Sequence, residues 1–425
     1  MIGVFVGSLL GVMALGVPIA FALLVSSVIL MYFLGIFDSQ IIAQNLISGA
    51  DNFPLMAIPF FMLAGELMNR GGLSRRIVDM AMTMVGHIRG GLGYVAIFAA
   101  VLFASISGSA VADTAALGAV LIPIMAKAGY DVNRASGLIA TGGIIAPVLP
   151  PSIGFIIFGV ASGVSITKLF MAGIVPGLLM AVGLVITWAI VARKDKVVVR
   201  PRASAKEMFV SFRDGIWALF LPVIIIVGLK FGIFTPTEAA VVAAVYALFV
   251  GLVVYRELKV KDLYNVFVHS SKMTSVVMFL VAAALVSSWL ITVANLPGAV
   301  IGMLEPFLDK PFLLLVMIML LVIVVGTAMD MTPTILILTP VLMPLVEAAG
   351  IDPVYFGVLF ILNNAIGLLT PPVGTVLNVM CGISKISMED LMKGIWPFLL
   401  VEIIILILLI IFPSLVLVPL GWFTS

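Results

Sequence analysis

Long apolar runs separated by short polar segments dominate this chain. A membrane-spanning helix needs about 20 predominantly apolar residues, and most of these runs approach that length. Crossings are predicted near residues 2–15, 17–35, 54–69, 133–160, 168–192, 216–234, 236–255, 273–294, 353–382 and 394–418. The composition agrees, because 63% of the residues are hydrophobic and 10% are charged, which excludes an ordinary soluble domain. The pattern therefore predicts an all-α polytopic membrane protein.

Two further apolar stretches, 92–125 and 312–346, are interrupted midway by small or polar residues. The interruptions are SISGS at 105–109 and GTAMDMTP at 326–333. Each arm is then about 13 to 16 residues, or roughly 20–24 Å of helix, which is shorter than the ~30 Å hydrocarbon core. We predict two re-entrant helical hairpins. The amphipathic segments 70–90 and 295–311 precede the hairpins, and each is either an interfacial arm or an ordinary loop.

The second half of the chain repeats features of the first half at a constant spacing of 221 positions. The matched pairs are Gly129 and Gly350, Asp131 and Asp352, Pro150 and Pro371, Gly173 and Gly394, and Pro176 and Pro397. Each repeat also has a span broken by a Pro-Pro pair, within 141–152 and within 363–375. Internal repeats with broken helices are typical of membrane transporters, which bind their substrate where the two repeats meet.

The distribution of charge assigns the two sides of the membrane, because Lys and Arg accumulate in cytoplasmic loops. One face collects Arg70, Arg75, Arg76, Arg89, Lys127, Arg134, Arg193, Lys194, Lys196, Arg200, Arg202, Lys206, Arg213, Arg256, Lys259, Lys261, Lys385 and Lys393. The other face collects Asp38, Asp51, Lys168, Glu305, Asp309, Lys310 and Asp352. The first face is predicted to be cytoplasmic, with both termini on the opposite side. The hairpins then open from opposite sides, so the repeats are inverted.

The chemistry is expected at the four breaks, because unpaired backbone groups persist within a membrane only where protein, water or ions satisfy them. Freed carbonyls and hydroxyls are hard oxygen ligands suited to Na⁺, and helix N-termini attract a carboxylate. Two cation sites flanking one anion site are predicted. The candidate Na⁺ ligands are Ser105, Gly108, Asp113, Gly143, Pro150, Ser152, Gly326, Met329, Asp330, Thr370, Pro371, Gly374 and Thr375. The candidate substrate ligands are Ser107, Ser109, Thr327, Asn363 and Asn364.

The acidic residues within the apolar stretches allow more than one interpretation. Asp113 and Asp330 each lie just beyond a hairpin break, where they bind the cation or stabilise the tip by hydrogen bonds. Glu66 is expected to pair with Arg70 one helical turn away. Glu238 is expected to close a capping box. No ligand is proposed for Glu402, in the last span.

Several other classes of function are excluded or disfavoured. The chain has no GxxxxGK[ST] loop for ATP, and its single cysteine, Cys381, excludes a disulfide framework. His87 and His269 lack the paired spacing of a metal site. Lys and Arg number 22 against 20 Asp and Glu, which does not indicate nucleic-acid binding. An intramembrane protease using Asp113 and Asp330 leaves the repeats and Pro-Pro breaks without a purpose, so no enzyme is predicted.

Several motifs along the whole chain resemble one family, the large membrane subunit of tripartite ATP-independent periplasmic (TRAP) transporters. They are ALGVPIAFAL, PLMAIPFFMLAGELMNRGG, FASISGSAVADTAALG, APVLPPSIGFI, IFTPTEAAVVAAVYAL and LLTPPVGTVLNV. The resemblance implies an elevator-type, Na⁺-coupled uptake system in the inner membrane, with no organic cofactor. It also implies a small membrane subunit and a periplasmic substrate-binding protein as partners. The implied substrate is a carboxylate, with sialic acid favoured and a C4-dicarboxylate next.

This resemblance also suggests how the chain is divided. Residues 1–91 and 216–311 form the scaffold with its interfacial arms, and 92–192 and 312–425 form the two halves of the transport domain. The linker 193–215 is a cytoplasmic connection that sets topology or contacts lipid headgroups. Two alternatives stay open: a standalone Na⁺/carboxylate symporter without a binding protein, and a non-transporting membrane scaffold subunit.

Overall fold

The structure is a computed structural model that describes residues 1–194 and 201–424, and these residues are helical without any β-strand. The predictions for Lys196 and Arg200 lie outside the described residues. The elements of the first half are α1 (Ile2–Ala14), α2 (Ile19–Leu34), α3 (Ser39–Ala50), η1 (Phe53–Met56), α4 (Ala57–Arg70), α5 (Leu73–Val85), α6 (Gly91–Ser107), α7 (Ala110–Lys127), α8 (Val132–Gly143), α9 (Ile153–Ser162), α10 (Ile166–Val191) and η2 (Ala192–Lys194). Those of the second half are α11 (Ala205–Lys230), α12 (Pro236–Phe249), η3 (Val250–Val254), α13 (Val260–Val293), α14 (Leu296–Leu308), α15 (Pro311–Ala328), α16 (Met331–Ala348), α17 (Pro353–Gly367), α18 (Thr375–Ser384), α19 (Met388–Ile411) and α20 (Ser414–Thr424).

The apolar helices agree with a multi-pass membrane protein. Within the described residues, eight helices are long and apolar enough to cross a membrane. A ninth is obtained if α3 and the following segment Phe53–Arg70, which are bent by 55°, form one span. The predicted all-α polytopic class is therefore confirmed.

The predicted hairpin breaks and broken helices are confirmed by the helix boundaries. The first hairpin is α6 and α7, which are separated at Gly108 and Ser109, and the second is α15 and α16, separated at Met329 and Asp330. The first broken helix is α8 followed by α9, and the second is α17 followed by α18. A hairpin, a broken helix and a long helix thus follow one another twice, as α6–α10 and α15–α19.

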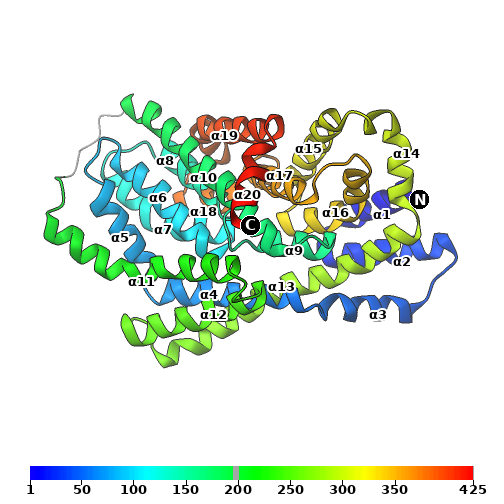
Figure 1. Cartoon of the computed structure of the whole chain (residues 1–425), viewed down its shortest axis with the longest axis horizontal. Coiled ribbons are helices and arrows are strands. Elements are labelled where there is room, and N and C mark those ends of the chain that lie inside the picture. The colour runs from blue at the N-terminus through cyan, green and yellow to red at the C-terminus, as the bar shows by residue number, and fades with distance from the viewer. Residues whose placement is uncertain (195–200, 425) are drawn as a thin grey trace.

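The two repeats exchange contacts through these broken helices. The second arm of each hairpin packs on the second half of the other repeat's broken helix: α7 packs on α18, and α16 packs on α9. Figure 1 shows the two hairpins on opposite sides of the molecule, with α9 and α17 between them. Each repeat therefore packs one arm of its hairpin on the broken helix of the other repeat. This exchange brings the tips of both hairpins toward one region.

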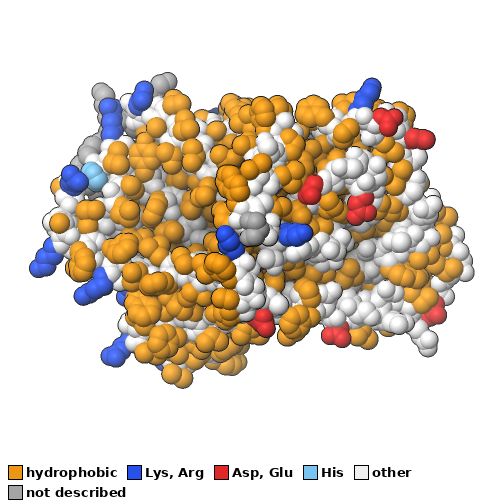
Figure 2. Space-filling model, in the orientation of Figure 1, with side chains coloured by type: hydrophobic (Ala, Val, Ile, Leu, Met, Phe, Trp, Pro, Cys, Tyr) orange, Lys and Arg blue, Asp and Glu red, His pale blue; other side chains and the backbone are white. Residues whose placement is uncertain are grey.

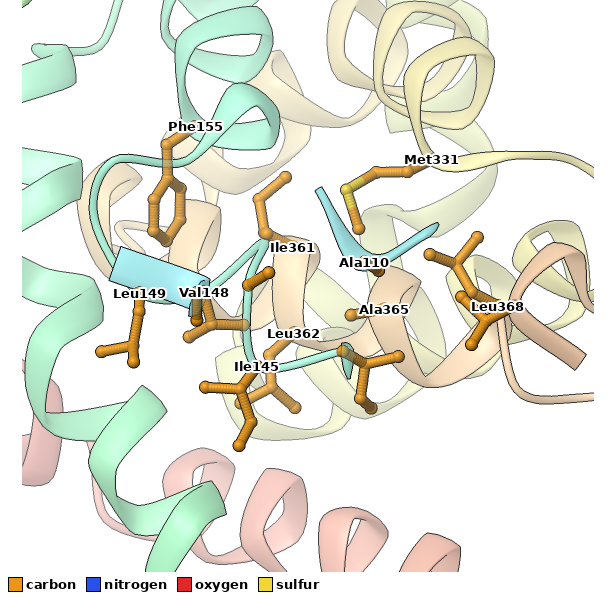
Figure 3. Packing of buried hydrophobic residues seen from close by; sticks show 14 of the residues in the cluster. Ala110, Ile145, Val148, Leu149, Phe155, Met331, Ile361, Leu362, Ala365 and Leu368 are labelled. Atoms are coloured by element: carbon orange, nitrogen blue, oxygen red, sulfur yellow. The ribbon is translucent and has the colours of Figure 1, made fainter. Parts of the chain in front are cut away.

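A buried apolar core fixes this region. Figure 3 shows Met331, at the start of α16, and Ala110, at the start of α7, over the same stretch of α17 near Ile361 and Ala365. All four side chains are buried. Burying a side chain the size of Met331 or Ile361 contributes about 1.5–3 kcal/mol in water, although in a membrane close packing rather than hydrophobicity holds helices together. The starts of α7 and α16, which follow the two hairpin tips, therefore pack on one shared platform.

The remaining helices form a second group around α13. Helix α13 packs on α2, α3 and α4, α4 packs on α12, and α11 packs on α5. Helix α5 buries Leu73, Ile77 and Val78 and leaves Arg75 and Asp79 exposed, as its amphipathic sequence predicts. On the face shown in Figure 2, Lys and Arg side chains gather at the end formed by α5, α8 and α11, and most Asp and Glu lie toward the other end.

The structure corrects three predicted boundaries. Residues 39–50 lie between predicted spans, yet they form α3, because Asp38 accepts a hydrogen bond from Gln40 N at 2.7 Å and caps the helix. Helix α11 begins at Ala205, inside the segment predicted to be a linker, since Ser204 and Glu207 form a capping box. The last predicted span is divided into α19 and α20, with Pro413 between them, because proline cannot donate a backbone hydrogen bond.

Candidate functional site

The tip of the first hairpin docks directly on the first broken helix. Gly108 has φ +62°, and a Cβ added to it would lie 2.4 Å from the carbonyl oxygen of Pro151. Only glycine suits both the left-handed conformation and this close approach. The peptide bond between Pro150 and Pro151 is cis, and the segment from Thr141 to Ser152 is buried. The predicted pairing of this hairpin with the first Pro-Pro break is confirmed.

Asp113 is the acidic residue at this tip, and it is only 2% exposed. One carboxylate oxygen accepts a hydrogen bond from Ser107 Oγ, which also accepts one from Ser109 N at 3.1 Å. The other oxygen, Oδ2, is buried without a hydrogen-bond partner among the described residues. Ser109 caps α7, because its Oγ accepts from Ala112 N at 3.4 Å. The structure thus joins Ser107, Ser109 and Asp113 in one network with an unsatisfied oxygen.

Thr114 is a residue of this tip that the sequence did not single out. Its hydroxyl is buried and has no hydrogen-bond partner among the described residues. A Cβ added to Gly143 would lie 1.9 Å from Thr114 Oγ1 and 3.1 Å from the carbonyl oxygen of Ala110. Gly143 is the last residue of α8, so the unpaired hydroxyl of Thr114 lies at the break of this helix. The only signal in the sequence was a hydroxyl next to Asp113.

The second hairpin docks on the second broken helix in a comparable way. Cβ atoms added to Gly367 and Gly326 would lie 2.9 Å and 3.4 Å from the Cα of the other glycine. Thr327 O accepts a hydrogen bond from Val373 N at 3.1 Å, and Asp330 Oδ1 accepts one from Thr375 Oγ1 at 3.2 Å. The predicted pairing of the second hairpin with the second Pro-Pro break is confirmed.

The two asparagines of the second broken helix lie inside α17 and have different partners. Asn364 Nδ2 donates to Met331 O at 3.2 Å, and a Cβ on Gly326 would lie 3.2 Å from Asn364 Oδ1. Asn363 Nδ2 donates to Met319 O at 2.6 Å, in the middle of α15. Both Oδ1 atoms are buried without a partner among the described residues. Asn364 therefore faces the hairpin break, whereas Asn363 ties α17 to α15.

The remaining predicted residues lie at the breaks, and several of their side chains bond the backbone of their own segment. The hydroxyl of Ser105 donates to Leu102 O at 2.9 Å, and that of Ser152 donates to Pro147 O at 2.5 Å. The hydroxyl of Thr327 donates to Val324 O at 2.8 Å, and that of Thr370 donates to Ile366 O at 3.0 Å. Pro371 is exposed and precedes the cis bond to Pro372, Gly374 caps α18 at φ +46°, and Met329 is extended between α15 and α16. Their oxygen lone pairs stay predicted cation ligands.

The two aspartates are not equivalent in the structure. Asp330 occupies the N-cap of α16, which is the position that Ser109 holds at the start of α7, and these two residues are 221 positions apart. Asp113 instead lies in the first turn of α7. Asp330 is exposed and Asp113 is buried. The prediction that each carboxylate lies just beyond its break holds for Asp113 and is wrong for Asp330. The two helices begin at equivalent residues, Ala110 and Met331, but Asp330 lies within its break.

A cavity of about 140 Å³ lies between the first hairpin and the other group of helices. Ser107, Ser109 and Asp113 line it from the hairpin side. On the opposite side it is lined by residues of α4 and α13, which the sequence did not indicate: Gly65, Glu66, Asn69, His269, Ser270 and Met273. The predicted ion pair of Glu66 with Arg70 is present at 2.5 Å. The predicted substrate residues at this tip thus face an opening in the protein.

Comparisons with known proteins agree with this architecture. The family described as "Tripartite ATP-independent periplasmic transporter, DctM component" matches residues 6–415. The chain is 57% identical over 419 residues to the 2,3-diketo-L-gulonate TRAP transporter large permease protein YiaN of Escherichia coli K12, covering 99% of both. It is 40% identical to the sialic acid TRAP transporter large permease protein SiaM of Vibrio cholerae, covering 95% of both. The solved structure of the Alcanivorax borkumensis YdaH transporter has a similar fold, with a TM-score of 0.64 at 15% identity over 90% of this chain and 88% of that one.

Proposed function

This chain belongs to the DctM component family of tripartite ATP-independent periplasmic transporters, and we propose that it imports an organic acid together with Na⁺. It is a multi-pass permease subunit, not an enzyme, and its relatives indicate the inner membrane.

The observation that carries Na⁺ coupling is that each hairpin break lies beside a buried oxygen atom that has no hydrogen-bond partner among the described residues. Thr114 Oγ1 lies beside the end of α8, and Asn364 Oδ1 lies beside the break at Gly326. A buried oxygen without a partner costs about 1–3 kcal/mol, so a ligand that satisfies it has a thermodynamic reason to bind. Hydroxyl and carbonyl oxygens are the donors that hard cations prefer. Each tip is therefore proposed to bind one Na⁺.

The substrate carboxylate is proposed to bind between the two tips. Helices α7 and α16 both begin there, and the shared platform of Ala110 and Met331 holds their N-termini in one region. A helix N-terminus carries roughly half a positive charge. Bound Na⁺ adds full positive charges and provides a partner for the unpaired oxygen atoms at the tips. Cation binding therefore favours the arrangement of the two tips that binds the substrate carboxylate.

Transport is proposed to follow an elevator motion. The repeats 92–192 and 312–425 carry both tips, and they move against the scaffold formed by 1–69 and 216–294. The cavity between the first hairpin and α4 and α13 supports this division, because it places an opening at the boundary of the proposed parts. A net positive loaded domain gains about 2.3 kcal/mol per charge for each 100 mV of membrane potential.

The partners and the substrate class follow from the relatives. A small membrane subunit and a periplasmic binding protein are proposed to act with this permease. The named substrates of two relatives, 2,3-diketo-L-gulonate and sialic acid, support an organic acid. A sialic-acid-like acid is favoured over a C4-dicarboxylate.

Thr114→Val tests the cation site, because valine keeps the volume of threonine and removes the hydroxyl. We expect the Na⁺ concentration for half-maximal uptake to rise about tenfold, which corresponds to about 1.4 kcal/mol, while Thr114→Ser stays close to the native value. Thr292→Val is a matched control, since Thr292 is exposed on α13 and its hydroxyl bonds Ser288 O. An unchanged Na⁺ dependence in Thr114→Val would remove Thr114 from the site.

A further inference from the structure

The cavity beside the first hairpin has a polar wall that the proposed function does not use. Asn69 is the penultimate residue of α4, and His269 and Ser270 are adjacent in α13. Gly65 brings α4 close to the hairpin, since a Cβ added to it would lie 3.8 Å from the Cβ of Ser107. The hairpin tip and the helices α4 and α13 therefore enclose one space.

Two buried oxygen atoms on opposite walls of this cavity lack hydrogen-bond partners among the described residues. One is Asp113 Oδ2 on the hairpin, and the other is Ser270 Oγ on α13. The residues are 2% and 6% exposed. A carboxylate oxygen accepts hydrogen bonds, and a serine hydroxyl both donates and accepts them. A ligand with hydroxyl groups satisfies both walls at once.

The charges of the cavity argue against a second carboxylate on the ligand. No Lys or Arg lines it within residues 1–194 and 201–424. Of its two acidic residues, Glu66 already pairs with Arg70 at 2.5 Å, and Asp113 accepts its one hydrogen bond among the described side chains from the Ser107 hydroxyl. One substrate carboxylate is compensated by Na⁺ and the helix N-termini, but a second one in this cavity would have no Lys or Arg to pair with. An ionised group that is buried without a paired charge is costly.

We propose that Asn69, His269 and Ser270 form the scaffold half of the substrate site, and that this wall selects a monocarboxylic acid with several hydroxyl groups over a dicarboxylic acid. The proposal rests on the proposed transport function and names its substrate class. The wall donates and accepts hydrogen bonds from the ligand hydroxyls, while the carboxylate stays at the tips. The permease then contributes to selectivity itself, in addition to any binding protein.

Protection of an introduced cysteine tests this proposal. Cys381 is the only cysteine of the chain, so Cys381→Ser provides a background without thiols. In that background, Met273→Cys places a thiol at the cavity mouth, because Met273 lines the cavity and is 48% exposed. Ser271→Cys is the matched control, since Ser271 is exposed on the same helix but does not line this cavity. The permease is purified with its small subunit, and its maleimide labelling rate is measured in NaCl.

The probes are D-gluconate, adipate and hexanoate, which share a six-carbon chain and differ in hydroxyl and carboxylate groups. We expect D-gluconate at ten times its dissociation constant to slow labelling of Met273→Cys about tenfold, since occupancy follows mass action. Adipate and hexanoate at the same concentration should leave the rate nearly unchanged. Ser271→Cys should label at the same rate in all three acids.

Three outcomes overturn the proposal. Equal protection by adipate or hexanoate contradicts selection for hydroxyl groups. Equal protection of Ser271→Cys indicates a change of conformation instead of occupancy. The third outcome is the absence of protection by any acid. If the same preparation still shows Na⁺-driven uptake in proteoliposomes with the binding protein, the cavity is not the substrate site and the transport proposal stands; if uptake is also absent, both fail.

Discussion

Replacing Gly108 by alanine should loosen the docking of the first hairpin tip. Two separate costs arise at this position. The left-handed conformation at φ +62° costs a residue with a Cβ about 1–2 kcal/mol. The new Cβ would also lie 2.4 Å from Pro151 O, which is a backbone atom that cannot rotate away. Overpacking of this kind adds about 1–3 kcal/mol, so the total is roughly 2–5 kcal/mol.

Gly129 offers a control that isolates the contact with Pro151. It follows the other end of α7, has φ +84°, and a Cβ added there meets no atom within 4 Å. Gly129→Ala therefore carries only the conformational cost of about 1–2 kcal/mol. The difference between the two variants, about 1–3 kcal/mol, reports the packing of the tip on the broken helix.

The assay compares apparent melting temperatures of the two variants in detergent and the Na⁺ dependence of uptake in proteoliposomes. Gly108→Ala should melt below Gly129→Ala, because its additional clash acts only in the folded state. It should also need more Na⁺ for half-maximal uptake, since the tip must dock before the cation site is complete. Equal melting temperatures and equal Na⁺ dependence would refute the docked geometry of Gly108.

Three further substitutions test other parts of the account. Asp330→Asn keeps an oxygen that accepts from Thr375 Oγ1 but removes the charge at the start of α16, so we expect slower Na⁺-driven uptake with retained expression, measured by initial rates. Ser107→Ala removes the hydroxyl that bonds Asp113, and we expect uptake to fall at least about tenfold because the carboxylate loses a bond worth about 1.5–3 kcal/mol; unchanged rates would exclude the network. Glu402→Met should raise the melting temperature, because both carboxyl oxygens of Glu402 are buried without a partner among the described residues and such groups cost about 1–3 kcal/mol each. A lower melting temperature would show that Glu402 has a structural role.

Much of the fold could be predicted from local signals in the sequence. The Pro-Pro pairs and the glycine and serine runs mark the breaks, because two successive prolines remove two backbone donors and glycine disfavours the helix. Single prolines such as Pro176 lie inside helices. The capping box of Thr235 and Glu238 is also confirmed, with Glu238 N donating to Thr235 Oγ1 at 3.3 Å. These features depend on residues a few positions apart, so the sequence alone contains them.

The parts that could not be predicted depend on contacts between distant segments. The hydroxyl of Thr114 lies against the first broken helix only because Gly143 approaches it from another helix, and Ser270 lines the cavity only because α13 lies opposite the first hairpin. The burial of Asp113 and the exposure of Asp330 also depend on the helices that pack against each hairpin tip.

The most direct test of the central claim is uptake of radiolabelled sialic acid into proteoliposomes that contain this permease and its small subunit. Uptake is measured with and without the binding protein, under an inward Na⁺ gradient and under a matched K⁺ gradient. The account predicts uptake only when both Na⁺ and the binding protein are present. Equal uptake in K⁺ would contradict coupling to Na⁺, and uptake without the binding protein would indicate a standalone carrier instead of a tripartite system.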